Sequence, residues 1–410
     1  MSDLHRPKGT SDVLPPESVS WRLARHTFDD IATRFGYDPV ITPIFEHTEV
    51  FARGVGEDTE VVEKQMYTFI DRGGRSLTLR PEATASVVRA AIQAGSRGRF
   101  KGVYWGPMFR YERPQKGRMR QFYQAGVEYL GSGSPEADVE VIEFGYRFLE
   151  AMRVPDVEVR LNSIGDPSDR RHYGTLLTEF LQQRKDGLST DARKRIGSNP
   201  MRVLDSKADR EIVADAPVPL DHIGAEAAEH FDAVKDGLAD MKIPYVIDTR
   251  LVRGLDYYNR TVWEYVPAGY GAAQSAVGGG GRYDGLFEIL GGAPTPAVGL
   301  AMGIERILLA SDQPHDPNDL DVFVVVADGA LRRAARTLTS TLRRAGIRAD
   351  MTDSERSVKA QFKEADRRRS AAAAVVGVEW HDGEITMRDL TTGDQERIGV
   401  GEINRWLEER

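Results

Sequence analysis

The sequence contains no cysteine, which excludes disulfide frameworks, thiolate zinc sites and cysteine nucleophiles. Long hydrophobic runs are also missing. The longest, such as 321–327 and 371–378, have the length of strands, whereas a bilayer span needs about 20 apolar residues. The N-terminal stretch lacks the apolar core of a signal peptide. We therefore expect a cytoplasmic protein without membrane contact, whose site uses carboxylates, arginines, hydroxyls, histidines or a cofactor.

Two phosphate-binding motifs are absent as well. The chain has neither a GxxxxGK[ST] loop nor a GxGxxG turn, so a nucleotide would have to be held in another way. An excess of positive charge is also lacking, because the formal net charge is −8. This argues against a protein that coats nucleic acid non-specifically, although it leaves room for a local basic patch that meets a structured RNA.

The 410 residues predict two to three domains. In the segment 17–35, apolar residues recur at helical spacing, and Gly36 can end that helix. The run 37–47 is extended but broken by two prolines, which suits an edge or interface strand. Strand patterns near 101–111 and 121–130, with helices on either side, indicate an α+β domain built on antiparallel strands.

Composition divides the chain further. Residues 170–235 are helical, highly charged and poor in large apolar side chains, which predicts an inserted helical subdomain. A Pro/Asp/Asn-rich linker at 311–320 marks a boundary, and an α/β pattern follows it. We predict four segments: a catalytic core in two parts (1–169 and 236–318), the insertion (170–235) and a C-terminal domain (319–410).

Three clusters could carry chemistry. The first, 104–128, has arginines and Glu112 in a loop between two strands; it is either an ordinary charged hairpin or an arginine clamp for a polyphosphate, since guanidinium forks match phosphate oxygens. The second is RGLDYY (253–258). Its arginine and aspartate could form a structural ion pair, or its tyrosines could line a small polar pocket. The third joins GGGGRYDG (278–285) to 296–306, where Arg306 could simply pair with Glu305.

These clusters, taken together, resemble the histidyl-tRNA synthetases, which are class II aminoacyl-tRNA synthetases, and the resemblance runs from KGTSDVLP (8–15) to the last helix. PIFEHTEVFARGVGEDTE resembles motif 1, FRYERPQKGRMRQF motif 2 and VGLAMGIERI motif 3. RGLDYYNRT and GGGGRYDGL resemble the two histidine-specific signatures, and RPEATA (80–85) the substrate loop.

The resemblance implies a class II antiparallel-sheet catalytic domain with a helical insertion, a C-terminal anticodon-binding domain and a homodimer. It implies ligation of histidine to its tRNA through a histidyl-adenylate, with ATP as substrate, Mg²⁺ bridging the phosphates and no protein-built metal site. The catalytic residues would be Arg110 and Arg253. The residues expected to bind histidine are Glu82, Thr84, Gln124, Glu128, Tyr257 and Tyr258. The residues expected to bind ATP are Arg110, Glu112, Arg118, Phe122 and Arg306.

Two questions stay open at the level of sequence. The C-terminal domain carries many helix arginines, which are either solvated or in contact with RNA; they are Arg332, Arg333, Arg336, Arg343, Arg344, Arg367, Arg368 and Arg369. The alternative function is that of a synthetase-like regulatory subunit of ATP phosphoribosyltransferase. Such subunits generally lose the catalytic signatures and the anticodon domain, whereas this chain retains both.

Overall fold

A computed structural model describes residues 4–56, 59, 61–96, 98–197, 199–204, 206–268, 276–312, 320–353 and 355–410. The chain forms two compact units, Met1–Gln313 and Pro314–Arg410. Most of the predicted linker at 311–320, and with it the predicted boundary at 318/319, lies outside the described residues, as do three positions of the motif 1 segment.

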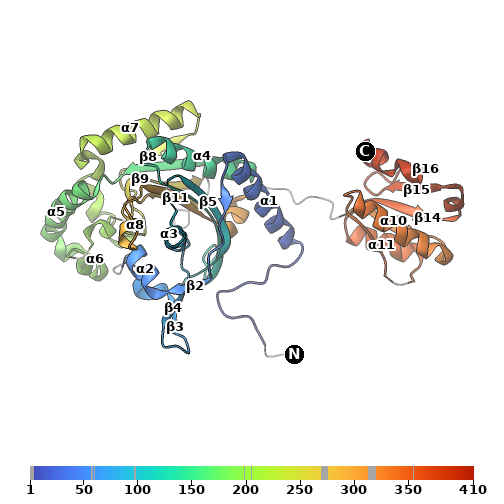
Figure 1. Ribbon diagram of the computed structural model, residues 1–410, viewed down its shortest axis with the longest axis horizontal. Helices are drawn as coiled ribbons and strands as arrows, with labels where there is room; N and C mark the ends of the chain where they lie inside the picture. The colour runs from blue at the N-terminus through green and yellow to red at the C-terminus, as the bar shows by residue number, and fades with distance from the viewer. Residues whose placement is uncertain are drawn as a thin grey trace. The chain divides into compact units, whose positions relative to one another are not determined.

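The first unit is built on an eight-stranded sheet (Figure 1) with the order β1-β5-β6-β11-β10-β9-β7-β8. Its central pairings are antiparallel, and only the edge strands β1 and β8 pair in parallel. This confirms the predicted α+β fold class. The strands are β1 (Asp38–Pro39), β5 (Phe100–Phe109), β6 (Gln121–Leu130), β7 (Val157–Ser163), β8 (Tyr245–Ile247), β9 (Asn259–Pro267), β10 (Gly278–Arg282) and β11 (Ala297–Gly303).

Helices cover one face of this sheet. In α1 (Glu17–Phe35), the predicted apolar stripe places Phe28 in contact with aromatic rings of α4 (Pro135–Ala151), and Gly36 ends α1 with a left-handed φ of 70°. Helices α7 (Ala225–Asp240) and α9 (Ile304–Ala310) add to the same core. Because side chains alternate along a strand, this packing leaves the other sheet face for a site.

The opposite face of the sheet meets α3 (Thr84–Gln93) and α8 (Leu286–Ile289), which share a second apolar cluster with Tyr257, Tyr258 and Tyr283. Beside α2 (Thr48–Val55) lies a separate three-stranded sheet of order β2-β4-β3. Its strands are β2 (Phe45–His47), β3 (Tyr67–Ile70) and β4 (Ser76–Leu79). The predicted extended run 37–47 is thus strand only at its two ends. Pro39 lies in β1, at the edge of the large sheet, where a residue without a backbone N–H is tolerated.

Residues between β7 and α7, here called the insertion, are helical and overlap most of the predicted insertion 170–235. The predicted segment also takes in the start of α7, whose Phe231 and Val234 pack in the main core. The insertion consists of α5 (Pro167–Gln183), α6 (Thr190–Arg195) and short 3₁₀ segments, among them η3 (Pro200–Val203). Tyr173, Leu177, Leu181 and Val203 bury their side chains in an apolar cluster of its own. The insertion is therefore a packed body and not a loop.

The second unit has a five-stranded sheet of order β13-β12-β14-β15-β16, parallel for its first three strands and antiparallel beyond β14. This matches the predicted α/β pattern. Its elements are β12 (Leu320–Val326), α10 (Arg332–Arg344), β13 (Ala349–Met351), α11 (Val358–Arg367), β14 (Ser370–Val376), β15 (Glu384–Asp389), β16 (Gln395–Gly399) and α12 (Ile403–Glu408). Among the described residues, no helix has the length and apolar character needed to cross a bilayer.

Candidate active site

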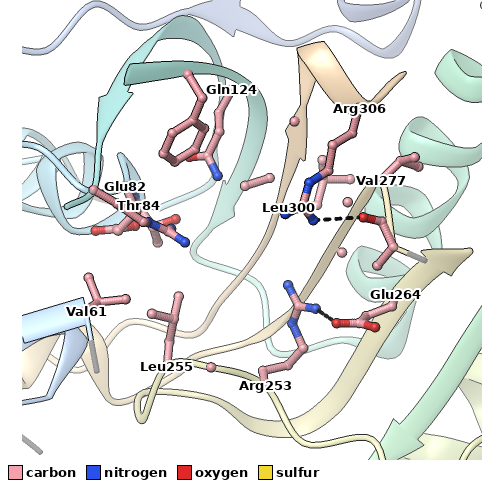
Figure 2. Close-up of a pocket in the computed structure, with 18 of the residues that line it drawn as sticks. Val61, Glu82, Thr84, Gln124, Arg253, Leu255, Glu264, Val277, Leu300 and Arg306 are labelled. Atoms are coloured by element: carbon pink, nitrogen blue, oxygen red, sulfur yellow. Dashed lines mark hydrogen bonds and ion pairs between the residues drawn. The ribbon is translucent and has the colours of Figure 1, made fainter. Parts of the chain in front are cut away.

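A cavity of about 420 Å³ opens on the sheet face that α1 and α4 leave free (Figure 2). Its lining combines side chains of β6, β9 and α9 with backbone of the glycine-rich β10 and β11. Gln124 of β6 lines it, whereas Val127 of the same strand points into the helix-covered core. A concave site with a few convergent polar groups is the ordinary form of a small-molecule pocket.

One part of the cavity, the carboxylate side, is lined by Glu82, Thr84 and Tyr258. Glu128 and Tyr283 are buried behind this lining and support it through hydrogen bonds. The Glu82 carboxylate caps the start of α3, accepting from the Thr84 backbone N–H at 2.7 Å and the Ala85 N–H at 3.0 Å. The Thr84 hydroxyl then donates to Glu128 Oε1 at 2.6 Å, and the Tyr283 hydroxyl donates to Glu128 Oε2. Both carboxylates are therefore fixed in orientation before any ligand binds.

Burial changes the acidity of both carboxyl groups. Glu128 is fully buried, and desolvation raises its pKa to about 8 in spite of its two hydroxyl donors. Desolvation also raises the pKa of Glu82, against the backbone N–H groups that stabilise its charged form. Strongly shifted groups in a cleft mark candidate functional sites. A ligand that donates an N–H to Glu128 would therefore favour the ionised form of its carboxyl group.

The other part of the cavity, the arginine side, is formed by Arg110, Arg118, Arg253 and Arg306. Figure 2 shows the guanidinium groups of Arg253 and Arg306 pointing towards the middle of the cavity, across from Glu82 and Thr84. Arg306 is held by the carbonyls of Gly117 at 2.9 Å and Ala276 at 3.1 Å, and Arg110 by the carbonyl of Pro81 at 2.9 Å. Carbonyls orient these cations without neutralising them.

The four arginines give this part of the cavity a positive charge. Burial lowers the pKa of Arg306, and the nearby Arg118 lowers it further. Arg253 has a counter-ion, Glu264 on β9, whereas Glu112 lies 4.0 Å from Arg118, at the limit of an ion pair. Buried cations close to one another are costly unless an anion joins them, so this arrangement suits a polyphosphate.

Two glycines of β10 create room for these side chains. A Cβ at Gly279 would lie 3.0 Å from the Arg253 guanidinium, and one at Gly281 would lie 2.6 Å from the ring of Tyr258. Any larger residue would push these groups into the cavity or out of line. The glycine-rich signature therefore has a steric purpose, namely the close approach of side chains to a strand.

The structure brings the sequence-predicted site residues together. All of them line the cavity except Glu128, which lies behind the wall, where a Cβ on Gly299 would touch its carboxylate. The predicted adenine-covering Phe122 has the Arg110 guanidinium 5.3 Å from its ring centre. The roles of these residues in binding stay predictions.

Sequence reasoning missed several contributors, namely Gln65, Tyr104, Arg202, Glu264 and Tyr283. Arg202 reaches the cavity from the insertion, and Glu264 supplies the counter-ion of Arg253. Tyr104 is buried near Glu128, with its hydroxyl unpartnered. Tyr283 carried a signal because it belongs to the glycine-rich signature, and Tyr104 lies in the first cluster (104–128). Gln65, Arg202 and Glu264 lie outside the three clusters.

The local pairings considered at the sequence level are not formed. Arg306 donates to carbonyls, while the Glu305 carboxylate accepts from the backbone N–H of Tyr123 at 3.0 and 3.1 Å. Arg253 pairs with Glu264, and Asp256 instead accepts from Arg202 at 3.0 Å. Among the described residues, no group of three or more histidine and acidic side chains lies close enough together to hold a metal.

The chain is similar to known proteins over nearly its whole length. A family model described as histidyl-tRNA synthetase matches residues 9–307, and one described as an anticodon binding domain matches residues 321–410. The histidine–tRNA ligase of Geobacillus kaustophilus is 43% identical over 417 residues, covering 98% of both chains.

Solved structures give the same result. The apo histidyl-tRNA synthetase of S. aureus superimposes with a TM-score of 0.80 at 35% identity, covering 99% of this chain and 100% of that one. A Bacillus halodurans C protein described as an ATP phosphoribosyltransferase regulatory subunit/histidyl-tRNA synthetase has a TM-score of 0.67 at 20% identity, over 92% of this chain and 100% of that one. At that identity the likeness concerns the fold alone.

Proposed function

The chain belongs to the histidyl-tRNA synthetase family, and on this premise we propose that it activates histidine with ATP and transfers it to the 3′ end of its tRNA. One observation carries this proposal: the guanidinium groups of Arg110, Arg253 and Arg306 line the same cavity as Glu82, Thr84 and Tyr258. A site that joins two anionic reactants needs this combination of neutralisation and alignment.

In the first step, a carboxylate oxygen of histidine attacks the α-phosphorus of ATP. A bond forms between them, the bond to the β-bridging oxygen breaks, and pyrophosphate leaves. Arg110 and Arg253 stabilise the charge on the α-phosphate, while Arg118 and Arg306 hold the outer phosphates. Phe122 and Arg306 enclose the adenine ring, since both line the cavity beside the backbone of β11.

Selection of histidine depends on the carboxylate side of the cavity. Glu128 accepts from an imidazole N–H, Tyr258 donates to the other ring nitrogen, and Tyr257 packs 4.6 Å from Tyr258, between ring centres. Glu82, Thr84 and Gln124 hold the ammonium and carboxylate groups; Gln124 Oε1 is buried without a partner and can accept from the ammonium. Buried hydrogen-bonding groups reject analogues lacking the imidazole by roughly 10⁴-fold.

In the second step, a ribose hydroxyl of the tRNA attacks the carbonyl carbon of the adenylate, and AMP leaves. The adenylate phosphate accepts the hydroxyl proton. We assign residues 319–410 to anticodon recognition. Several predicted arginines there are already paired with acids, namely Arg343 and Arg368 with Asp350, and Arg367 with Glu364. Arg333 and Arg336 are exposed on α10 and are the better candidates for RNA contact.

Mg²⁺ would enter with the nucleotide. The carboxylates of Glu112 and Glu264 line the cavity, but both lie beside arginines, so the phosphate oxygens of ATP would supply most ligands, as is usual for Mg²⁺. Glu112, whose contact with Arg118 is the longer one, would be the protein ligand. Bound there, the ion would supply positive charge that stabilises the departing pyrophosphate.

We propose that the chain forms a homodimer through the small sheet. Phe45 and Phe69 lie on the same face of this sheet and are 53% and 44% exposed. Their partners across the strands, Leu79 and Leu77, lie on that face too. Ile41 is 96% exposed nearby in sequence. A contiguous apolar face of this kind is typical of a protein interface. Sedimentation should give twice the chain mass, and Phe45→Asp should shift it towards a monomer.

The decisive test is histidine-dependent exchange of pyrophosphate into ATP. The purified protein should support it with histidine and with no other standard amino acid. A regulatory subunit would bind histidine without exchange, and that result would reject the proposal. Deleting 320–410 should cripple aminoacylation far more than exchange; equal losses would argue against anticodon recognition by that unit. The cytoplasm, where translation takes place, stays the predicted location.

A further inference from the structure

The RGLDYY loop (253–258) is held in place largely by side chains of the insertion. Asp256 Oδ1 accepts two hydrogen bonds from insertion residues, one from Asn199 Nδ2 at 2.9 Å and one from Arg202 Nη2 at 3.0 Å. Both donors flank or belong to η3, more than fifty residues earlier in the chain. The aspartate of the signature is thus tied to the insertion and not to its neighbour Arg253.

Arg170 of α5 reinforces this connection. Its Nη1 donates to the backbone carbonyl of Asp256 at 3.1 Å and to that of Tyr258 at 2.6 Å. At the far end of the loop, Arg260 forms a two-pronged ion pair with Asp166, the residue that caps α5, at 2.7 and 3.0 Å. The insertion therefore grips the loop from its middle to the start of β9.

The same loop cannot easily settle elsewhere. Its Asp256 N–H donates to the carbonyl of Val55 at 3.2 Å, and a Cβ at Gly56 would lie 2.7 Å from Asp256 Oδ2. The end of α2 thus closes around Asp256 from the other side. With this residue fixed, the loop presents Arg253 to the arginine side and Tyr258 to the carboxylate side of one cavity.

We propose that Asp256, Arg170, Asn199 and Arg202, here called the Asp256 hub, form a positioning device through which the insertion sets the RGLDYY loop for histidine activation. This inference rests on the proposed function, and it makes the insertion a participant in the first chemical step. The physical reason is alignment: a displacement of about 1 Å in a group that stabilises a transition state can cost about 100-fold in rate.

Asp256→Ala in the full chain tests the hub. It should lower the kcat of histidine-dependent pyrophosphate exchange by about 100-fold, because Arg253 loses its alignment, while the unfolding midpoint stays close to that of the wild type. Asp256→Asn retains an oxygen acceptor and should recover most of the rate. Asn199→Ala removes one donor outside the cavity and should give an intermediate loss. Arg202 lines the cavity itself, so its variants would not separate positioning from substrate contact.

Asp209 provides a matched control inside the same insertion. It is 2% exposed and accepts from the backbone N–H and hydroxyl of Ser189 at 2.6 and 2.7 Å, without touching the loop. Asp209→Ala should lower the unfolding midpoint but leave kcat near the wild-type value. Equal losses of kcat in both alanine variants, or full activity of Asp256→Ala, would overturn the inference.

Hydrogen–deuterium exchange separates this inference from the proposed function, because it needs no activity. The peptide covering 253–258 should exchange faster in Asp256→Ala and remain as in the wild type in Asp209→Ala. Unchanged protection of the loop in Asp256→Ala refutes the hub even if the enzyme is active. If the wild type shows no histidine-dependent pyrophosphate exchange, but the loop of Asp256→Ala takes up deuterium faster as expected, only the proposed function is refuted.

Discussion

The two sides of the cavity differ in how their charged groups are satisfied. On the carboxylate side, Glu82 and Glu128 each have both oxygens bound by protein donors. On the arginine side, Arg110 and Arg306 donate to carbonyls and keep their net charge. The difference indicates which ligand group each side would bind. The arginine side suits an anion, whereas the carboxylate side is preorganised for a ligand with N–H donors.

Removing an arginine should have the largest effect on this contrast. Arg253→Ala should lower the rate of histidine-dependent pyrophosphate exchange by about 100- to 1000-fold, the usual cost of losing one donor to developing charge. Histidine binding, measured by calorimetry, should be nearly unchanged, because the carboxylate side stays intact. Strong residual exchange would contradict the assigned role of Arg253.

The matched control is Arg160→Ala. Arg160 belongs to the same sheet, but pairs at the surface with Glu158 at 3.2 Å and lies near Asp248 at 3.9 Å. Exposed pairs of this kind contribute little to stability. Exchange by this variant should match the wild type, which would show that loss of an arginine is damaging only inside the cavity.

A change on the carboxylate side should act on histidine and not on ATP. Glu128→Gln keeps the size of the side chain but removes a charge-assisted acceptor, which typically contributes about 1.5–3 kcal/mol. Above pH 8, where Glu128 is mostly ionised, the KM for histidine should therefore rise about 10- to 100-fold while the KM for ATP changes little. Glu140→Gln is the control, since Glu140 accepts from Tyr37 at 2.9 Å, away from the cavity. Equal increases in the KM values for histidine and ATP would contradict the division of the cavity into two sides.

Sequence patterns predicted those parts of the molecule that depend on local spacing. The helix 17–35 was predicted with the bounds that α1 has, because its apolar residues recur on one face and Gly36 can adopt a positive φ. The site residues were predicted from motif resemblance, which carries positions that no periodicity could reveal. What brings them into one cavity is the pairing of strands far apart in the chain.

Contacts between distant segments could not be predicted. Tyr283 and Glu128 are 155 residues apart, and Arg202 and Asp256 are 54 apart. The alternative that paired Arg306 with its neighbour Glu305 is not realised, because adjacent side chains on a helix diverge. Glu305 turns instead to the backbone of Tyr123 on β6. The hydrogen-bond partners of these side chains depend on how distant segments pack, and no local sequence pattern indicates this.

A smaller effect on histidine binding should come from adding a side chain at Gly299, which separates Glu128 from the cavity. A Cβ at Gly299 would lie 1.9 Å from Glu128 Oε2 and 2.7 Å from the carbonyl of Val127. Overpacking of this kind costs about 1–3 kcal/mol. Gly299→Ala should therefore lower the unfolding midpoint and raise the histidine KM by about tenfold, with the ATP KM unaffected. Gly174→Ala, at an open position on α5, should leave both KM values unchanged.

A rise in histidine affinity with pH, at most as large as the effect of Glu128→Gln, tests whether the carboxylate side is as closed as its geometry implies. Burial raises the pKa of Glu128 to about 8 in the free protein. Below that pH most molecules carry a protonated, uncharged Glu128. This form is a weaker acceptor for the imidazole N–H than the carboxylate is. Histidine affinity should therefore increase as pH rises from 6 to 8 and level off above it. The imidazole of free histidine titrates in part of the same range, with a pKa of about 6.5, but Glu128→Gln keeps that titration and loses the carboxyl one. Comparing the two pH profiles by calorimetry isolates Glu128: a slope that survives in full in Glu128→Gln belongs to the ligand, and a slope that flattens above pH 7 in the variant alone belongs to the buried carboxyl.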